Sequence, residues 1–308
     1  MIKKDIFDND IKKMFRASAK DRLYRFIMAG NRIRGAIVHA TRMVNEMRAN
    51  HETGPLETLV LGQAYVAGAL LGSGLKDKDD RLCMSVECSG PVKGLDVEVN
   101  GCGEIRGYLK NTRIAETCPE KIRSLSALYG AGFLTITKYL ADSSAPYSGR
   151  VVLEYGSLAE DIASYFLKSE QVPTGIRLNI FFDEDNIVKG AGGILIQALP
   201  GAEPDMVAEA EKILADMKPP GELFAAGHDP DRIITETFSA LDPQILSDTR
   251  VEFFCRCSKD GMKLHLNALP GKDKKDIMEN GPFPLEIRCH NCNSVYCFTK
   301  QELALLFT

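Results

Sequence analysis

Two closely spaced pairs of cysteines near the end of the chain constrain its fold more than any other feature. They read Cys255-Arg-Cys257 and Cys289-His-Asn-Cys292. Folding the segment between them back on itself brings four sulfurs together, the donor set of a closed tetrahedral Zn²⁺ site with Zn–S distances of about 2.3 Å. The second pair has a common zinc-finger spacing, and the first is one residue tighter. The spacing therefore predicts one Zn²⁺ per chain, bound by Cys255, Cys257, Cys289 and Cys292 in the reduced state.

The predicted zinc site has two interpretations that the spacing leaves open. The segment 251–308 is too short for a hydrophobic core alone to stabilise it safely, and a structural zinc contributes an apparent ~10–16 kcal/mol to the folding of such a unit. The site is then either a permanent structural element or a switch. A switch is possible because thiolates react with peroxide, and a disulfide in either pair removes two ligands.

The other cysteines of the chain show no metal spacing. Cys297 is interpreted as a strand residue rather than a fifth ligand, and His265 and His290 as surface or packing residues. The remaining thiols are interpreted as small buried side chains; they are Cys83, Cys88, Cys102 and Cys118. Four aromatic residues are expected to form the small core of the zinc unit: Phe253, Phe254, Tyr296 and Phe298.

A length of 308 residues suggests about two domains. Alternating apolar residues predict a three-stranded meander over Arg81–Leu109, with a hairpin at Asn100-Gly101. A capping box of Ser157 and Glu160 predicts the start of a helix. The remaining expected elements are a helical region over Asn31–Gly74 with a break near His51–Pro55, and strands over Phe133–Leu140, Arg150–Tyr155, Ile176–Phe182 and Gly193–Leu199.

Beyond Pro200 the pattern changes to short helical segments with few large apolar residues. Such a stretch must pack against something else, and its stability is expected to be marginal. The predicted organisation is an α/β (α+β) domain of mixed or antiparallel sheets with packed helices over 1–201, a metastable helical linker over 202–250, and a small zinc-binding domain with four cysteine ligands over 251–308, which is a redox-switch domain if its zinc site is a switch.

Several classes of function are excluded by missing motifs. Gly30–Gly35 has the glycine spacing of a P-loop but lacks the Lys-Ser/Thr pair, and Gly190–Gly193 lacks the third glycine of a dinucleotide loop. No catalytic acid–base pair stands out, so the chain is not predicted to be an enzyme. The charged first thirty residues do not fit a secretory signal. The apolar stretch Leu59–Leu75 is expected to be a buried helix, and the protein to be cytoplasmic and independent of membranes.

Two alternative functions arise from the same residues. The first fifty residues carry a net charge of +7, so the chain could bind nucleic acid through this arm and the zinc unit. However, the zinc unit interleaves Lys and Arg with Asp and Glu, and an amphipathic helix with a solvated face is the favoured interpretation of the arm. A thiol oxidoreductase that uses Cys289 and Cys292 would require a βαβ context, which is missing. Nucleic acid is therefore not expected as a partner.

The chain resembles the redox-regulated heat-shock chaperonins of about thirty-three kilodaltons, a family of bacterial holdases. The resemblance covers nearly the whole chain and rests on both cysteine pairs and three further motifs. These motifs are Arg106-Gly-Tyr108, Ser157-Leu-Ala-Glu160 running on to Ser169-Glu-Gln-Val-Pro-Thr174, and Gly192-Gly-Ile-Leu-Ile-Gln-Ala-Leu-Pro-Gly201.

The resemblance implies a stress-response mechanism. In the family, the reduced, zinc-bound form is inactive. Oxidants, aided by heat, form one disulfide in each pair and expel the zinc, which by position implies Cys255–Cys257 and Cys289–Cys292. The zinc unit and linker then unfold, and the protein binds unfolded or misfolded clients without ATP, as a homodimer. The resemblance assigns no role to Cys297 or to the basic N-terminal segment.

Overall fold

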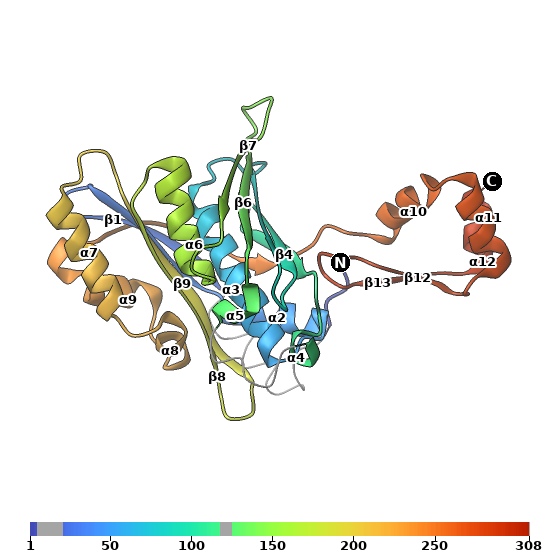
Figure 1. Cartoon of the computed structure of the whole chain (residues 1–308), viewed down its shortest axis with the longest axis horizontal. Helices are drawn as coiled ribbons and strands as arrows, with labels where there is room; N and C mark the ends of the chain where they lie inside the picture. Colours follow the sequence, from blue (N-terminus) through green and yellow to red (C-terminus); the bar gives the residue numbers. More distant parts are fainter. Residues whose placement is uncertain (5–20, 118–124, 308) are drawn as a thin grey trace.

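The computed structural model describes residues 1–4, 21–117 and 125–307 (Figure 1). Cys118 and residues 5–20 of the basic N-terminal segment lie outside these residues. Two large sheets and one hairpin contain the strands β1 (Arg22–Met28), β2 (Ile33–His39), β3 (Arg81–Cys88), β4 (Gly94–Asn100), β5 (Glu104–Leu109), β6 (Gly132–Tyr139), β7 (Tyr147–Val152), β8 (Thr174–Phe182), β9 (Val188–Ala198), β10 (Gln244–Arg250), β11 (Glu252–Phe253), β12 (Leu285–Arg288) and β13 (Val295–Phe298).

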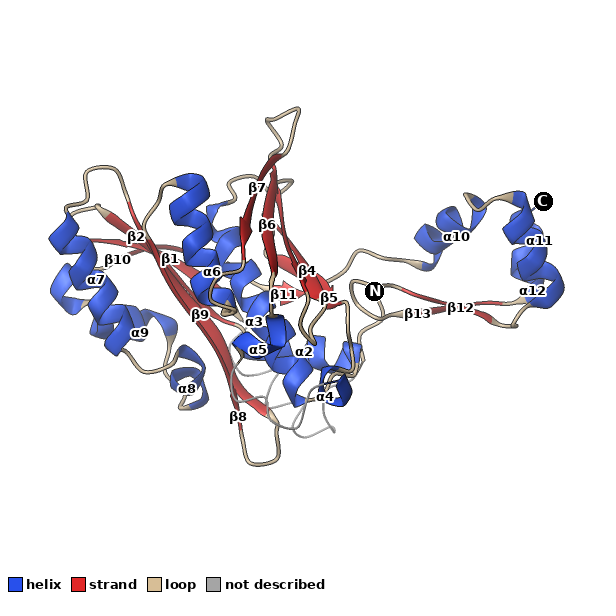
Figure 2. Ribbon diagram, viewed as in Figure 1, coloured by secondary structure: helices blue, strands red, loops and turns tan. Residues whose placement is uncertain are grey.

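Helices fill the space between the sheets, cover one of them and build the C-terminal end (Figure 2). They are α2 (Thr41–His51), α3 (Pro55–Leu71), α4 (Ile114–Thr117), α5 (Ser126–Tyr129), α6 (Leu158–Tyr165), α7 (Pro204–Asp216), α8 (Pro220–Ala225), α9 (Pro230–Thr237), α10 (Lys259–Asn267), α11 (Gly271–Asn280) and α12 (Lys300–Phe307). Short 3₁₀ turns follow α3 (Gly72–Gly74) and α9 (Ser239–Leu241), and a π-helical turn follows α6 (Phe166–Glu170).

Helix α3 lies between the two large sheets. The five-stranded sheet has the order β10-β1-β2-β9-β8, and the six-stranded sheet has the order β11-β5-β4-β3-β6-β7. Helix α3 is apolar on every side, as expected for a helix buried on all faces. This segment, extended to Gly74, is long and apolar enough to cross a membrane, but 78% of its most apolar window is buried in the protein. The predicted buried helix is thus confirmed.

The meander predicted over Arg81–Leu109 is confirmed as strands β3, β4 and β5, paired antiparallel. The turn after Asn100 places its positive φ at Gly103, where an added Cβ would lie 2.1 Å from the carbonyl oxygen of Arg250. Only glycine permits this approach, and it lets β11 join the sheet parallel to β5. The segment leading to the first cysteine pair is therefore part of the large sheet.

Two elements differ from the sequence prediction. The expected helix from Asn31 begins only at Thr41, because β2 occupies the preceding residues as an inner strand between β1 and β9. A strand buried on both faces lacks the alternation that would reveal it. Strand β10 was expected as loop or short helix; its mostly exposed side chains give no pattern, and pairing with β1 defines it.

The predicted capping box at the start of α6 is wrong in its details. Ser157 makes no side-chain cap, and the buried carboxylate of Asp161 instead accepts the amides of Glu154 and Tyr155, at 2.8 and 3.1 Å. The acidic residue therefore fixes the entering loop rather than the first helical turn. The predicted apolar stripe behind it is confirmed as buried; it comprises Leu158, Ile162, Tyr165 and Phe166.

Helices α7, α8 and α9 cover the outer face of the five-stranded sheet and form a second hydrophobic core with it. We call this core the linker core. The sheet contributes residues such as Phe26 and Ile37, and the helices contribute Phe224 and Ile234. Phe238, just after α9, has its ring centroid 5.7 Å from that of Phe26. The stretch after Pro200 thus packs against the sheet, as its composition predicted.

The C-terminal elements extend away from the sheets (Figure 1). Among the described residues, helices α10, α11 and α12 and the β12–β13 hairpin share a third core with four buried members: Leu266, Tyr296, Phe298 and Leu303. So small a core supplies little stability on its own.

Candidate metal centre

The two cysteine pairs meet on strand β5. Cys255 and Cys257 follow β11, whose continuation at Phe254 donates its amide to the carbonyl of Ile105 (2.9 Å). Cys289 and Cys292 lie in the turn between β12 and β13. Within that turn, the amide of Cys289 donates to the carbonyl of Ser294 at 3.0 Å. The carbonyl of Asn291, in the same turn, accepts the amide of Gly107 on β5, and this bond docks the turn on the sheet.

All four sulfurs lie within 4.8 Å of one another. The Sγ atoms of Cys255 and Cys289 are 3.8 Å apart, and those of Cys257 and Cys292 are 3.3 Å apart. A tetrahedral Zn²⁺ with four thiolates at about 2.3 Å requires sulfur–sulfur separations of about 3.8 Å. The donor set and its spacing therefore fit a zinc ion with only small adjustments.

The other described cysteines lie outside this cluster. Cys297 lies on β13, opposite Glu286, and is exposed. Cys102, in the turn between β4 and β5, is also exposed, so the expectation that it is buried is wrong. Cys83 and Cys88 are half-buried on β3, and burial raises the pKa of the Cys83 thiol to about 11. His265 and His290 are both exposed, as expected from the sequence.

The sulfurs pack against the core between the two large sheets rather than inside the small C-terminal core. Cys255, Cys289 and Cys292 are buried in the same cluster as α3. The expectation that Phe253 belongs to a separate core of the zinc unit is wrong. Its ring is fully buried 6.0 Å from that of Tyr65 on α3, because β11 has joined the large sheet. Phe254 is only partly buried beside a surface cavity, whereas Tyr296 and Phe298 do lie in the small core.

Polar groups surround the sulfurs. The Tyr296 hydroxyl lies 3.2 Å from the Cys257 sulfur, and the Ser294 hydroxyl lies 3.2 Å from the Cys292 sulfur. The Arg106 guanidinium approaches the Cys255 sulfur, with Nη1 at 3.7 Å. Hydrogen bonds from the thiols of Cys289 and Cys292 hold the pKa of the Cys255 thiol well below its usual range. The cluster thus favours thiolate at Cys255, the form that binds a metal.

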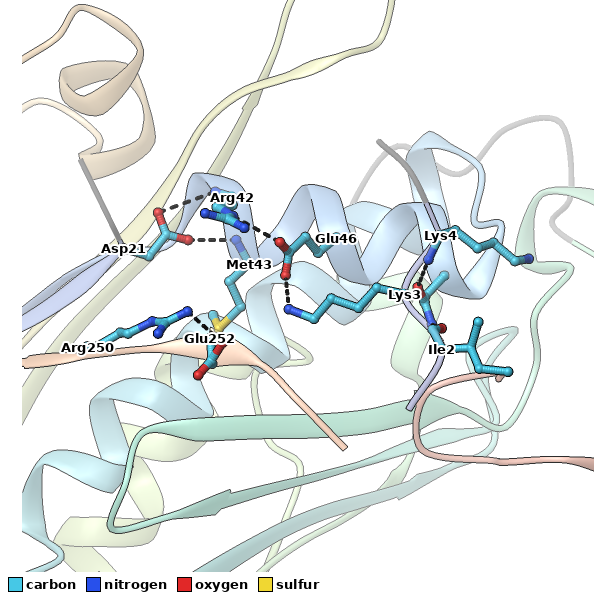
Figure 3. A network of polar contacts seen from close by, with 10 residues as sticks. Ile2, Lys3, Lys4, Asp21, Arg42, Met43, Glu46, Arg250 and Glu252 are labelled. Atoms are coloured by element: carbon cyan, nitrogen blue, oxygen red, sulfur yellow. Dashed lines mark hydrogen bonds and ion pairs between the residues drawn. The ribbon is translucent and has the colours of Figure 1, made fainter. Parts of the chain in front are cut away.

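The first residues of the chain close over the same turn. The amide of Ile2 donates to the Ser294 hydroxyl at 2.9 Å, and the Ile2 carbonyl accepts the side-chain amide of Asn50 at 3.0 Å. Asn50, on α2, also donates to the carbonyl of Cys292 at 2.7 Å. Figure 3 shows Lys3 reaching Glu46 on α2, with Nζ–Oε2 at 2.5 Å. Residues 1–4 therefore link the second cysteine pair to α2.

Asp21 directly precedes β1 in the sequence, and its side chain contacts the first turn of α2 in the same network (Figure 3). Its carboxylate accepts the amide of Met43 at 2.6 Å and that of Arg42 at 3.3 Å. Burial raises the pKa of this carboxyl to about 7, against the lowering effect of these two amides. The charged groups around it are Arg42, Glu46, Arg250 and Glu252.

We expect Asp21 to make the folded protein less stable as the pH rises. Its folded pKa lies above the ordinary value of 3.8, so between about pH 4 and pH 7 the folded state holds a proton that the unfolded chain releases. Raising a pKa by one corresponds to about 1.4 kcal/mol, so the loss of stability is on the order of 2–4 kcal/mol. Thermal unfolding of wild type and Asp21→Asn at pH 5 and pH 8 tests this. The stability of the variant relative to wild type should be greater at pH 8 than at pH 5. An equal difference in stability at the two pH values contradicts the assignment.

Spacing could not identify the groups around the sulfurs. Arg106 stands in a motif that carried the family resemblance, yet its neighbour Cys255 is 149 positions away. Ser294 and Asn50 belong to no motif, and their contacts depend on how β5, α2 and the β12–β13 turn are packed. The four cysteines, in contrast, were detectable because each pair is local in sequence.

Comparisons with known proteins agree along the chain. The family model described as "Hsp33 protein" matches residues 21–299. The 33 kDa chaperonin of Agathobacter rectalis is 33% identical over 92% of this chain and 98% of its own length, and that of Bacillus subtilis is 31% identical over 92% and 97%. The crystal structure of the 33 kDa chaperonin (heat shock protein 33 homolog) from Thermotoga maritima is similar with a TM-score of 0.84. It is 26% identical, and the match covers 94% of this chain and 98% of that one.

Proposed function

The chain belongs to the Hsp33 protein family, and on that premise we propose that it is a redox-regulated, ATP-independent chaperone that holds unfolding proteins during oxidative and heat stress. The observation that carries the proposal is the group of four sulfurs within 4.8 Å, placed where the linker joins the C-terminal elements. The relatives named as chaperonins support the chaperone role. The proposed role is binding, in the cytoplasm, rather than catalysis.

In the resting state, Cys255, Cys257, Cys289 and Cys292 would hold one Zn²⁺. The bound ion would supply a cross-link between the segment after β11 and the β12–β13 turn. Oxidation by peroxide would join Cys255 to Cys257 and Cys289 to Cys292. Each disulfide forms as two thiolates give up two electrons to one hydrogen peroxide, which takes up two protons from solvent and is reduced to two waters. No sulfur would then be left in the thiolate form that a metal needs.

Loss of this cross-link would reach the linker through the chain itself. Strand β10 pairs with β1 and runs through Val251 into β11 and Cys255. Once the cysteine segment is free, the mostly exposed β10 keeps few apolar contacts to hold it, and β11 is held mainly by the buried ring of Phe253. Helices α7, α8 and α9 precede them, so we propose that residues 202–250 unfold together with residues 251–308, while residues 1–201 stay folded.

Release of the helices would uncover the sheet side of the linker core. Phe26, Ile37 and Ile194 are all at most 1% exposed in the closed form. An apolar surface of this kind binds the exposed apolar segments of unfolded proteins because both are removed from water. We propose this face as the client-binding surface, and a second copy of the oxidised chain as a further partner.

One experiment tests the proposed function. Zinc and free thiols are measured before and after treatment with peroxide, while light scattering follows the aggregation of a heat-denatured client. We expect the oxidised sample to lose its zinc and four thiols per chain and to suppress aggregation without ATP. The control is the oxidised sample treated with dithiothreitol and Zn²⁺, which should return to the inactive form. Equal suppression by the reduced, zinc-bound protein would contradict redox control.

A further inference from the structure

Arg106 connects the outer face of the six-stranded sheet to the cysteine cluster. From β5, its Nη2 donates to Glu98 Oε1 on the neighbouring strand β4 at 2.8 Å. Its Nη1 donates to the Cys255 sulfur at 3.7 Å. The two contacts use different nitrogens of one planar group, so the ion pair with Glu98 fixes the direction in which the guanidinium faces the sulfur.

The cluster needs a positive charge close by. Four thiolates and one divalent cation carry a net charge of −2, and Cys255 and Cys292 are almost completely buried. A buried charge is costly unless a partner compensates it. The Tyr296 hydroxyl lies beside the Cys257 sulfur, and the Ser294 hydroxyl accepts from the Cys292 thiol; both hydroxyls are neutral. Within residues 1–4, 21–117 and 125–307, Arg106 is the side-chain cation that donates to a cluster sulfur.

The position of Arg106 also separates the cluster from solvent. A cavity of about 270 Å³ opens on the outer face of the sheet. Its lining includes Arg81, Glu98, Arg106, Phe254 and Arg256. Cys255, directly beyond the guanidinium, is only 1% exposed. The Arg106 side chain therefore lies between this cavity and the buried sulfur.

We propose that Arg106, oriented by Glu98, is a positioning residue that sets how tightly the four-cysteine centre holds its metal and how fast peroxide releases it. The inference rests on the proposed function, because it concerns the stability of the same centre. Removing the guanidinium leaves the negative cluster without its charged donor and extends the cavity towards Cys255. Both changes favour release of the metal.

The test compares four full-length, reduced variants with wild type: Arg106→Met, Arg106→Lys, Glu98→Gln and Arg81→Met. Zinc affinity is measured by competition with a chromophoric chelator. Titration with Co²⁺ and its thiolate charge-transfer band reports whether all four sulfurs still coordinate. Arg81 is the matched control, because it lies on the same face and reaches Glu98 at 3.9 Å, while the donor to the Cys255 sulfur is Arg106.

We expect Arg106→Met to weaken zinc binding about 10- to 100-fold, the usual range for a group that supports a metal ligand. Arg106→Lys should lose less zinc affinity, since it retains a charge, and the loss of affinity in Glu98→Gln should be intermediate. Peroxide should release zinc faster in the same order. Arg81→Met should behave like wild type in both measurements.

Two results would overturn the inference. One is an affinity of Arg106→Met and Glu98→Gln equal to that of wild type, and the other is an equal loss in Arg81→Met, which would indicate a general effect of surface charge. If Arg106→Met fails to fold by circular dichroism, Arg106→Lys and Glu98→Gln decide the question. Failure of wild type itself to bind zinc would refute the proposed function instead, so the two failures are distinguishable.

Discussion

Replacing Cys292 by serine is expected to remove the metal and to unfold the C-terminal elements. Cys292 is fully buried, and its sulfur lies 3.3 Å from that of Cys257. A structural zinc contributes an apparent ~10–16 kcal/mol to a small unit of this kind. The third core, with four buried residues among those described, offers no stabilisation of that size in its place. Zinc content per chain and hydrogen exchange over residues 251–307 measure the effect.

Cys297→Ser is the matched control for this variant. Cys297 lies five positions further along, on β13, and its side chain is exposed. The same change of sulfur to oxygen should leave zinc content and exchange protection as in wild type. Protection over residues 251–307 that survives in Cys292→Ser would show that packing, and not the metal, holds these elements in place.

The second large effect is expected from Phe238→Ala. Phe238 is fully buried in the linker core against Phe26. Removing a buried Phe side chain costs about 3–5 kcal/mol, which is a large share of the stability of a marginal segment. We expect the linker to detach from the five-stranded sheet while the cysteine centre stays reduced and bound to zinc. The variant should then suppress client aggregation without any oxidant, and exchange over residues 202–250 should rise.

Leu246→Ala provides the comparison, because Leu246 is a large apolar residue on β10 that is 60% exposed. Its truncation removes little packing, so the linker should stay closed and inactive. If Phe238→Ala opens the linker by hydrogen exchange but does not suppress aggregation, the uncovered face of the sheet is not the surface that binds clients.

The sequence predicted elements whose pattern is local and missed those that depend on distant partners. The meander over β3–β5 was predictable because buried and exposed residues alternate in its strands. Strand β2 was missed because both its faces are covered, and β10 because nearly all its side chains are exposed. Neither condition leaves a period in the sequence.

The candidate site divides in the same way. Each cysteine pair was evident from spacing alone. That the sulfurs rest against the large core, with Phe253 beneath them, follows from the pairing of β11 with β5, which two residues of strand do not reveal. The contacts of Arg106 and Asn50 with the centre likewise join parts of the chain more than a hundred positions apart.

The pairing of N-terminal residues with C-terminal ones has a consequence for the synthesis of the protein. Strand β1 pairs with β10, and the contact between Arg22 and Asp248 spans 226 positions. The contact between Ile2 and Ser294 spans 292 positions. A ribosome adding about 5–20 residues per second needs on the order of 15–60 s to span the longer interval. Until β10 has been synthesised, the edge of β1 that it covers has no strand partner from that part of the chain. The cysteine centre is completed later still, because Cys289 and Cys292 follow β10 in the sequence.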